Sequence, residues 1–204
     1  MVRDDCADTF CQKYTMQTHQ QKELYQLTDV ATKSIDSVPE SGSYDHVFSY
    51  WRLPAFHDLQ RTTLYSPKRP ESGNEPFVTI TKWRRELDLE KLRDPIERLK
   101  HPKDLEPTIE EVSTVIDSDL VDKVVSELSN VSLPSIRPDE DIVGLDGISY
   151  RFAFSSGYFS LDVTWWCDYP KAWQDTARRI ESIISNLESV KTKPSNKPLR
   201  PSGK

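Results

Sequence analysis

Glycine, cysteine and long apolar runs are all scarce in this chain of 204 residues. Its 6 glycines form neither G-x-G-x-x-G nor G-x-x-x-x-G-K, the two patterns that bind nucleotide phosphates through backbone N–H groups. No stretch approaches the roughly 18 consecutive apolar residues that a transmembrane helix needs. The sequence therefore predicts a soluble protein that has no glycine-rich phosphate loop and does not span a membrane.

The cysteine content and the first residues bear on the compartment. The 3 cysteines exclude a fully paired disulfide framework. Residues 1–27 are polar throughout and lack the apolar core of about 7 to 15 residues that a secretory signal requires. We therefore expect a cytoplasmic protein whose thiols are reduced.

Charge argues against a nucleic-acid partner. The chain carries 27 Lys and Arg residues against 33 Asp and Glu residues, which gives a net charge of -6. A nucleic-acid-binding domain usually presents a basic patch to the phosphate backbone. The length favours one domain, with little room for a second.

Composition divides the chain into three parts. Residues 1–41 hold few large apolar side chains, so either a short helix over residues 17–33 or disorder would fit. Residues 191–204 hold five bases, no acid and three prolines, and cannot bury enough apolar area to offset the entropy of ordering. We expect a flexible segment over residues 1–41, one domain over 42–190 and a disordered basic tail over 191–204. Neither end is expected to contribute much stability.

Strand and helix patterns alternate between these ends. Alternating or β-branched runs predict strands over residues 44–52, 60–66, 76–84 and 108–116. A helix is expected over residues 86–100, with a break near Pro95. Asp117 or Ser118 can cap the next helix, whose apolar side consists of Leu120, Val121, Val124, Val125 and Leu128.

The clearest pattern is a hairpin after the Asp-Gly turn at residues 146–147. Its strands alternate the apolar sets Ile148, Tyr150, Phe152, Phe154 and Phe159, Leu161, Val163, Trp165. A two-residue turn at residues 156–157 puts both sets on one face, whereas a three-residue loop would separate them. This register sets Phe152 opposite Leu161, and it sets Arg151 opposite Asp162 as an ion pair.

A final helix is predicted over residues 170–190, with Asp168 as its cap and Pro170 in its first turn. Its apolar residues follow a spacing of four, three, four and three: Trp173, Ala177, Ile180, Ile184 and Leu187. Such a stripe packs across the apolar face of a sheet. The predicted fold is therefore α+β, a mainly antiparallel sheet with two or three helices, the last packing across the sheet.

Few residues have the spacing of a catalytic or metal site. The sequence has no CxxC, HxxxH or HExxH motif, and its 4 histidines are scattered. A zinc site at His46 and His57 would need Asp45, Asp58 or Cys167 brought close by the fold. Cys167 precedes a predicted helix, which favours a thiolate, but no histidine is near it in sequence. We therefore expect no metal and no cofactor.

Acidic residues cluster between residues 103 and 146, where twelve acids stand against three bases. The clusters are Glu110–Glu111, then Asp117, Asp119 and Asp122, and finally Asp139, Glu140 and Asp141. Three interpretations are open: a solvated face, a docking surface for a basic partner, and a divalent-metal site.

An aromatic pair is the second candidate for partner binding. Trp166 alternates outward from the core-facing Trp165, and Tyr158 alternates to the same side. An exposed aromatic pair can anchor a partner protein. The alternative is that a further helix covers this second face of the sheet.

Two segments carry a resemblance. Residues 47–57 read VFSYWRLPAFH, and residues 144–150 read GLDGISY before a strand that ends in Trp165-Trp166. Together with Pro170-x-x-Trp173 they resemble small uncharacterised bacterial α+β proteins with a Leu-Asp-Gly turn, a Trp-ended hairpin and a C-terminal helix. The resemblance brings no activity with it. Some small acidic bacterial proteins of similar architecture are immunity proteins against toxins, which is an analogy of architecture.

Two hypotheses about function follow. The first is a non-enzymatic interaction module, immunity-like, that offers an acidic surface to a basic protein partner, with Asp139, Glu140, Asp141, Tyr158 and Trp166 as binding residues. The alternative is a small hydrolase-like or metal-dependent enzyme that uses His57, Cys167 or the acidic clusters.

Overall fold

The computed structural model of this chain describes residues 5–38, 42–54, 57–69, 71, 73–94, 96, 106–132, 147–156, 159–166 and 173–190. The expected basic tail over residues 191–204 lies outside these ranges. Among the described residues there are six strands and four helices.

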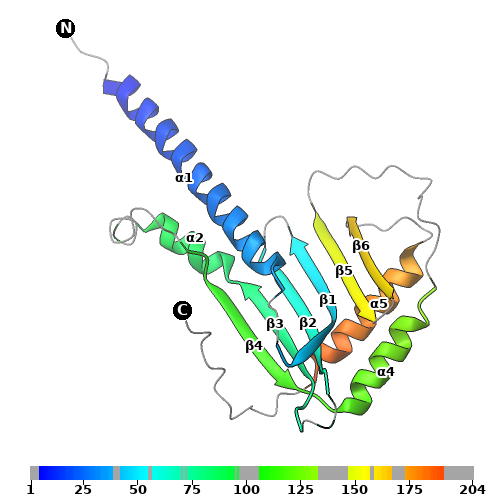
Figure 1. Ribbon diagram of the computed structural model, residues 1–204. Coiled ribbons are helices and arrows are strands. Elements are labelled where there is room, and N and C mark those ends of the chain that lie inside the picture. The colour runs from blue at the N-terminus through cyan, green and yellow to red at the C-terminus, as the bar shows by residue number, and fades with distance from the viewer. Residues whose placement is uncertain are drawn as a thin grey trace.

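A single antiparallel sheet organises the molecule (Figure 1). Its strands are β1 (Tyr44–Pro54), β2 (Gln60–Pro67), β3 (Phe77–Trp83), β4 (Ile109–Val115), β5 (Ile148–Ser156) and β6 (Phe159–Trp166). They lie in the order β4-β3-β2-β1-β5-β6, so β4 and β6 are the two edges. The predicted α+β class is confirmed, and the strand bounds differ from the predicted ranges by one or two residues.

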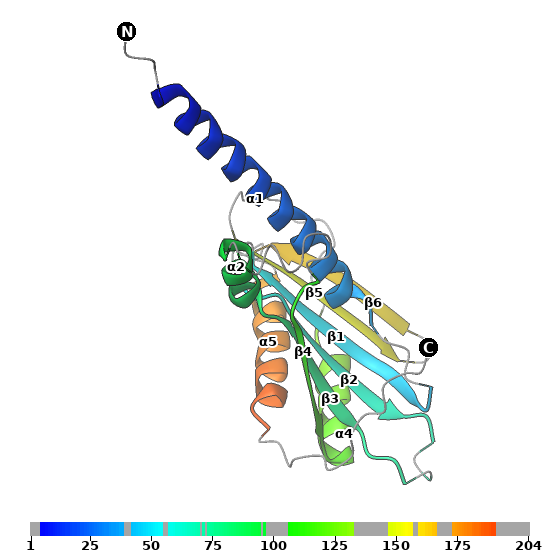
Figure 2. The same ribbon diagram turned by 90° about the vertical axis from the view of Figure 1, so that its left-hand side faces the viewer.

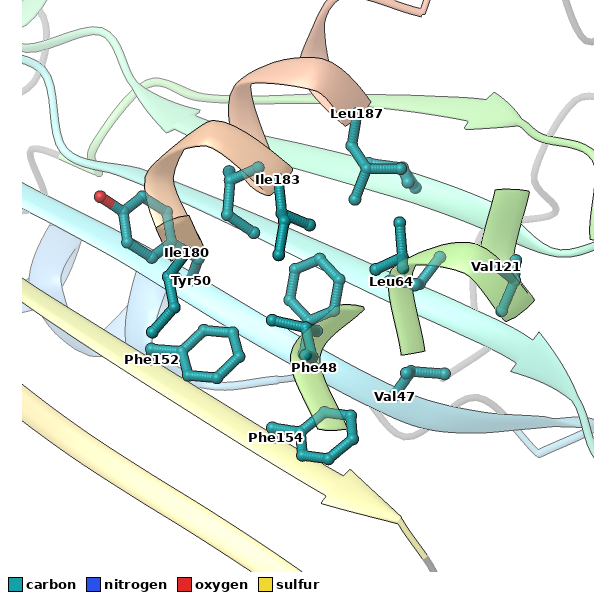
Figure 3. Close-up of a cluster of buried hydrophobic side chains, with 14 of the residues drawn as sticks. Val47, Phe48, Tyr50, Leu64, Val121, Phe152, Phe154, Ile180, Ile183 and Leu187 are labelled. Atoms are coloured by element: carbon teal, nitrogen blue, oxygen red, sulfur yellow. The ribbon is translucent and has the colours of Figure 1, made fainter. Parts of the chain in front are cut away.

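Two helices, α4 (Ser118–Ser129) and α5 (Gln174–Glu188), cover one face of the sheet (Figures 1 and 2). The apolar stripe of α5 packs against Phe48, Leu64 and Phe152 of the central strands (Figure 3). Among the described residues this main core has 15 buried members, and α4 contributes three of them, Val121, Val124 and Leu128. The predicted packing of the last helix across the sheet is therefore confirmed.

The opposite face is covered by α1 (Asp5–Asp36) and α2 (Arg85–Arg93). Leu27, Ala31 and Ile35 of α1 are buried in a second core, which has 7 buried members in the part of the chain that the structure describes. The first half of the helix extends beyond the sheet in both views (Figures 1 and 2). The helix is longer than the stretch 17–33, and its second half packs on the domain that the sequence placed at 42–190. No helix in the described ranges is both long and apolar enough to cross a membrane.

The helix ends follow local chemistry. α2 ends at Arg93, two residues before Pro95, as the predicted break requires. α5 begins at Gln174 rather than at residue 170, and the expected cap Asp168 lies outside the described residues. Asp117 occupies the N-cap position of α4, but its side chain makes no capping hydrogen bond. The predicted capping bond is therefore wrong, although its position is right.

The hairpin register is displaced from the prediction. Ser156 pairs with Phe159 and Phe152 pairs with Val163, so two residues still separate the strands, but they are 157 and 158. Every pairing moves by two positions along β6. A shift of two preserves the side-chain face, so Phe152 and Leu161 still share the face on which α5 packs. The Arg151–Asp162 ion pair also forms, although it is diagonal because Arg151 lies opposite Thr164.

Candidate functional site

Most of the partner-binding residues proposed from the sequence lie outside the described ranges: Asp139, Glu140, Asp141 and Tyr158. Cys167, the candidate nucleophile, also lies outside them. The remaining candidate, Trp166, is described. The structure also describes the acidic clusters on β4 and α4, the histidines His46 and His57, and two buried charged residues, Asp88 and Arg61.

Trp166 is the last residue of β6 and pairs with Ser149 of β5. Its neighbour Trp165 packs against the main core and stacks on Tyr150, with ring centroids 5.7 Å apart. Because successive side chains alternate between faces, Trp166 faces the side of the sheet on which α1 lies. There it is half-buried. Helix α1 covers part of this face and reaches β5 through an ion pair between Asp36 and Arg151 at 2.8 Å.

The acidic pair Glu110–Glu111 lies on the edge strand β4, where both side chains are exposed. Arg84 Nη1 donates to Glu110 Oε2 at 2.9 Å, and the hydroxyl of Thr81 donates to Glu111 Oε2 at 3.3 Å. These contacts are at the surface, where an ion pair contributes about 0 to 1 kcal/mol. They leave both carboxylates open to water and to a partner.

The next acidic cluster surrounds the start of α4. Asp117, Asp119 and Asp122 are all exposed. Negative charge in the first turn is favourable because the helix dipole places partial positive charge there. Over the described range 106–132 the sequence has seven acids and one base, Lys123. This part of the surface therefore has a negative potential. Among the described residues no group of three or more His, Cys, Asp or Glu side chains is placed to hold a metal ion.

The two histidines proposed for zinc have different environments. His57 is exposed, just before β2. His46 is half-buried on β1, where its Nε2 lies 2.8 Å from Ser49 Oγ. Burial lowers the pKa of His46, a backbone hydrogen bond at Phe48 raises it in part, and the charge of Arg61 lowers it further. The neutral imidazole is therefore favoured.

A chain of hydroxyl groups continues from His46 across the sheet. Ser49 Oγ lies 2.9 Å from the hydroxyl of Thr63, its direct cross-strand partner. A histidine bonded to a serine has the contact of a nucleophile and its base. However, Ser49 and Thr63 are both 0% exposed, so no substrate carbonyl can approach the serine oxygen in this conformation. The chain therefore stabilises the sheet.

Asp88 is a buried carboxylate that no sequence pattern marks. It is 1% exposed on α2 and accepts hydrogen bonds from Trp83 Nε1 at 2.7 Å and from the backbone N–H of Thr108 at 2.7 Å. Lys91 Nζ and the Thr108 hydroxyl donate to its other oxygen. Burial raises the pKa of Asp88, but these bonds outweigh it and hold the pKa below its ordinary value. All of these donors are residues of the protein itself. Asp88 therefore holds α2 against the end of β3 and the start of β4.

Arg61 is a buried cation that the sequence analysis also missed. It is 2% exposed on β2, and its Nη1 donates to the backbone oxygens of Ile35 and Ser37 at the end of α1. Its Nη2 donates to the hydroxyl of Thr81 at 3.2 Å. The last carbonyls of a helix have no partner within the helix, and a cation there also favours the dipole. Arg61 therefore caps α1 from the sheet.

Comparison with known proteins adds no relative: no family model, no curated protein and no solved structure matches this chain.

Proposed function

We propose that this protein is a non-enzymatic interaction module, immunity-like, that presents an acidic surface to a basic protein partner. The observation that carries the proposal is the surface around β4 and α4. Glu110, Glu111, Asp117, Asp119 and Asp122 are exposed there, with Lys123 as the one base within residues 106–132. The cluster of Asp139, Glu140 and Asp141 follows in the sequence and adds charge of the same sign.

The distribution of shifted pKa values supports the proposal. A catalytic site usually brings a perturbed ionisable group into an accessible cleft. Here Asp88 and Arg61 are almost fully buried at junctions between elements, His46 contacts the fully buried Ser49, and the Arg151–Asp162 pair lies on the surface of the sheet. Each of these groups already binds neighbouring parts of the fold. The exposed carboxylates, in contrast, can contribute a field that steers a basic partner toward the protein.

The experiment begins with affinity capture from the native cell, with the bound protein identified by mass spectrometry. Association with that purified partner is then measured at several salt concentrations. Two neutralised variants test the surface: Asp139→Asn/Glu140→Gln/Asp141→Asn, and Glu111→Gln/Asp119→Asn/Asp122→Asn. The control is Asp29→Asn/Glu86→Gln/Glu90→Gln, which removes the same charge from exposed positions on α1 and α2, the helices on the opposite face of the sheet from α4.

Both test variants should associate more slowly than the control, and the rate for the unmodified protein should fall steeply with salt because exposed charges are screened. Melting temperatures should stay close together, since exposed substitutions change stability by less than about 0.5 kcal/mol. An acidic partner, or an association rate at low salt that matches the control in both variants, would contradict the proposal.

A further inference from the structure

The two edges of the sheet differ in how they are protected. An edge strand presents unpaired backbone N–H and C=O groups, and proteins usually guard it with charge, proline or short length. In the described part of the chain no further strand pairs with β4 or with β6. On β4 the exposed carboxylate of Glu111 provides such a guard, whereas that of its neighbour Glu110 is paired with Arg84.

The other edge, β6, has no comparable guard. Its eight residues read FSLDVTWW, with no proline, no glycine and one charged side chain. That one charge, Asp162, is neutralised within the sheet because Arg151 donates to its two oxygens at 3.0 Å and 2.7 Å. β-branched and aromatic residues make up most of the strand, and they favour strand pairing.

The apolar side chains of β6 are also incompletely covered. Leu161 and Trp165 pack against the main core, Val163 alternates to the same face, and all three are only half-buried. On the neighbouring strand β5, Phe152 and Phe154 are 2% and 5% exposed on the same face. The apolar face of the sheet therefore continues to β6 and stops there with its last row partly in water.

We propose that β6 pairs antiparallel with β6 of a second copy of this chain, so that one sheet runs through both copies. A two-fold axis perpendicular to the sheet would keep the helices α4 and α5 of both copies on the same side. A second copy fits because the edge is self-complementary: it has no uncompensated charge to repel itself, and its half-buried apolar row would meet an identical row.

The side chains also select the register. Residues directly opposite in an antiparallel pair point to the same face, so the apolar rows meet only when odd-numbered residues oppose odd-numbered residues. Two registers meet this condition and still pair all but one residue of β6, centred on Asp162 and on Val163. A pairing centred on Asp162 would put two carboxylates opposite each other. A pairing centred on Val163 instead puts Leu161 opposite Trp165 of the second copy and Asp162 opposite Thr164 of the second copy. The inferred register is therefore centred on Val163.

The guarded edge limits the assembly to two copies. Pairing β4 with a second β4 over its whole length, centred on Val112, would place the Glu111 carboxylates of the two copies at diagonal positions, and a pairing centred on Glu111 would place them directly opposite, which is destabilising. The sheet can therefore be extended by a second copy at β6, whereas pairing at β4 is disfavoured. The expected assembly is a closed dimer, not a filament.

Cross-linking tests the register. Cys6, Cys11 and Cys167 are first replaced by serine, and a single cysteine is introduced as Val163→Cys or, as the control, Ser160→Cys. Val163 would lie opposite itself, within reach of a disulfide. The two Ser160 positions would lie about 20 Å apart, beyond the roughly 7 Å that a disulfide tolerates. Under mild oxidation Val163→Cys should form a covalent dimer and Ser160→Cys should not. The reverse result, or equal cross-linking, would overturn the register.

Sedimentation of the full chain tests the dimer itself. The mass should rise with concentration toward twice 23.6 kDa and no further. Thr164→Glu would place a second carboxylate opposite Asp162 twice per dimer, which should raise the dissociation constant about tenfold. Val112→Glu adds the same charge at the exposed β4 edge and should leave the dissociation constant unchanged. A monomer at every concentration, larger assemblies, or an unchanged dissociation constant for Thr164→Glu would overturn the proposal.

Discussion

Asp88 and Arg61 are charged side chains that lie almost wholly out of water, 1% and 2% exposed. Moving a charge into a protein interior costs several kcal/mol unless hydrogen bonds compensate. Asp88 is compensated by donors from β3, α2 and the residue before β4, and Arg61 by carbonyls at the end of α1. Each charge is therefore stable only while the elements around it are in place, which makes both residues sensitive reporters of the fold.

Replacing Asp88 with asparagine should destabilise the protein by about 3 kcal/mol, because the new amide would point N–H groups at donors that now bind a carboxylate. Urea unfolding at neutral pH measures the change. Glu90→Gln, an exposed substitution on the same helix, is the matched control and should stay within about 0.5 kcal/mol of the unmodified protein. An Asp88→Asn protein as stable as this control would show that the hydrogen bonds contribute nothing.

The stabilising effect of Asp88 should also depend on pH. Its pKa in the folded protein is below the ordinary 3.8, so the folded state binds this proton less readily than the unfolded state. The contribution is therefore complete above the ordinary pKa and is lost as pH falls through the lower folded value. The difference in unfolding free energy between the unmodified protein and Asp88→Asn should shrink as pH falls below 3.8. A difference that grows in this range would contradict the assignment.

His46 should give stability a second dependence on pH, in a higher range. Burial lowers its pKa below the ordinary 6.5, so the unfolded state takes up this proton first as the solution is acidified. Unfolding free energy should therefore fall as pH drops from 6.5 toward the lower pKa of the folded state. In His46→Gln, whose amide can still reach Ser49, this part of the pH dependence should be absent. Identical pH profiles for the two proteins would contradict the prediction.

The helix α1 is the element whose contribution differs most from the expectation for residues 1–41. Among its described side chains, Leu24 packs against the second core, and Leu27, Ala31 and Ile35 are buried in it. Most of the remaining residues of the segment are polar, and three buried side chains four residues apart are too sparse to distinguish a docked helix from a disordered tail. The residues that hold the helix in place lie on other elements. Trp51 of β1 and Trp83 of β3 belong to the same core as the helix, and Arg61 of β2 donates a hydrogen bond to the carbonyl of Ile35.

Two truncations measure this contribution. A chain that starts at residue 21 keeps the packed half of α1 and should melt close to the full chain. A chain that starts at residue 42 loses that half and leaves the Arg61 guanidinium without the carbonyls of Ile35 and Ser37. Its melting temperature should fall by more than about 10 °C. The full-length variant Ala31→Glu should show a similar loss by disrupting the packed face. Equal melting temperatures for all the chains would show that α1 does not dock.

At the scale of elements, local sequence patterns predict where helices and strands begin and end better than they predict which residues pair across neighbouring strands. The end of α2 before Pro95 and the bounds of the strands follow from local chemistry, and they agree with the structure. The face shared by Phe152, Leu161 and Val163 was also predictable, because burial depends only on whether a shift is odd or even. The exact register was not predictable, since a displacement of two residues keeps every apolar side chain on the same face.

The candidate site was predictable to a smaller extent. Local charge alone places Glu111 and Asp119 at the surface, where the structure has them. Asp88 and Arg61 could not be found this way, because nothing in the local sequence distinguishes them from ordinary solvated charges: Asp88 stands between two leucines and Arg61 between a glutamine and a threonine. Their burial depends on donors and carbonyls contributed by residues distant in the chain, such as Thr108 and Ile35.

At the scale of the whole molecule, one sheet separates two cores of unequal size. Among the described residues the core under α4 and α5 has 15 buried members, whereas the core under α1 and α2 has 7. Local opening is easiest where few apolar contacts hold an element. We therefore expect α1 to leave the sheet in a separate opening that requires less free energy than global unfolding.

Hydrogen exchange of the native protein, with and without one core substitution, tests this order of opening. Ile184→Ala in α5 removes buried methyl groups from the larger core and should lower the global unfolding free energy by about 3 kcal/mol. Amides of β1, which exchange only through global unfolding, should lose that much protection. Amides of α1 between Leu27 and Asp36 should keep theirs, because their own opening does not involve Ile184. In the matched variant Ile35→Ala, both sets of amides should lose protection. If Ile184→Ala lowers protection equally in α1 and β1, the two cores unfold as one cooperative unit and the inferred order is wrong.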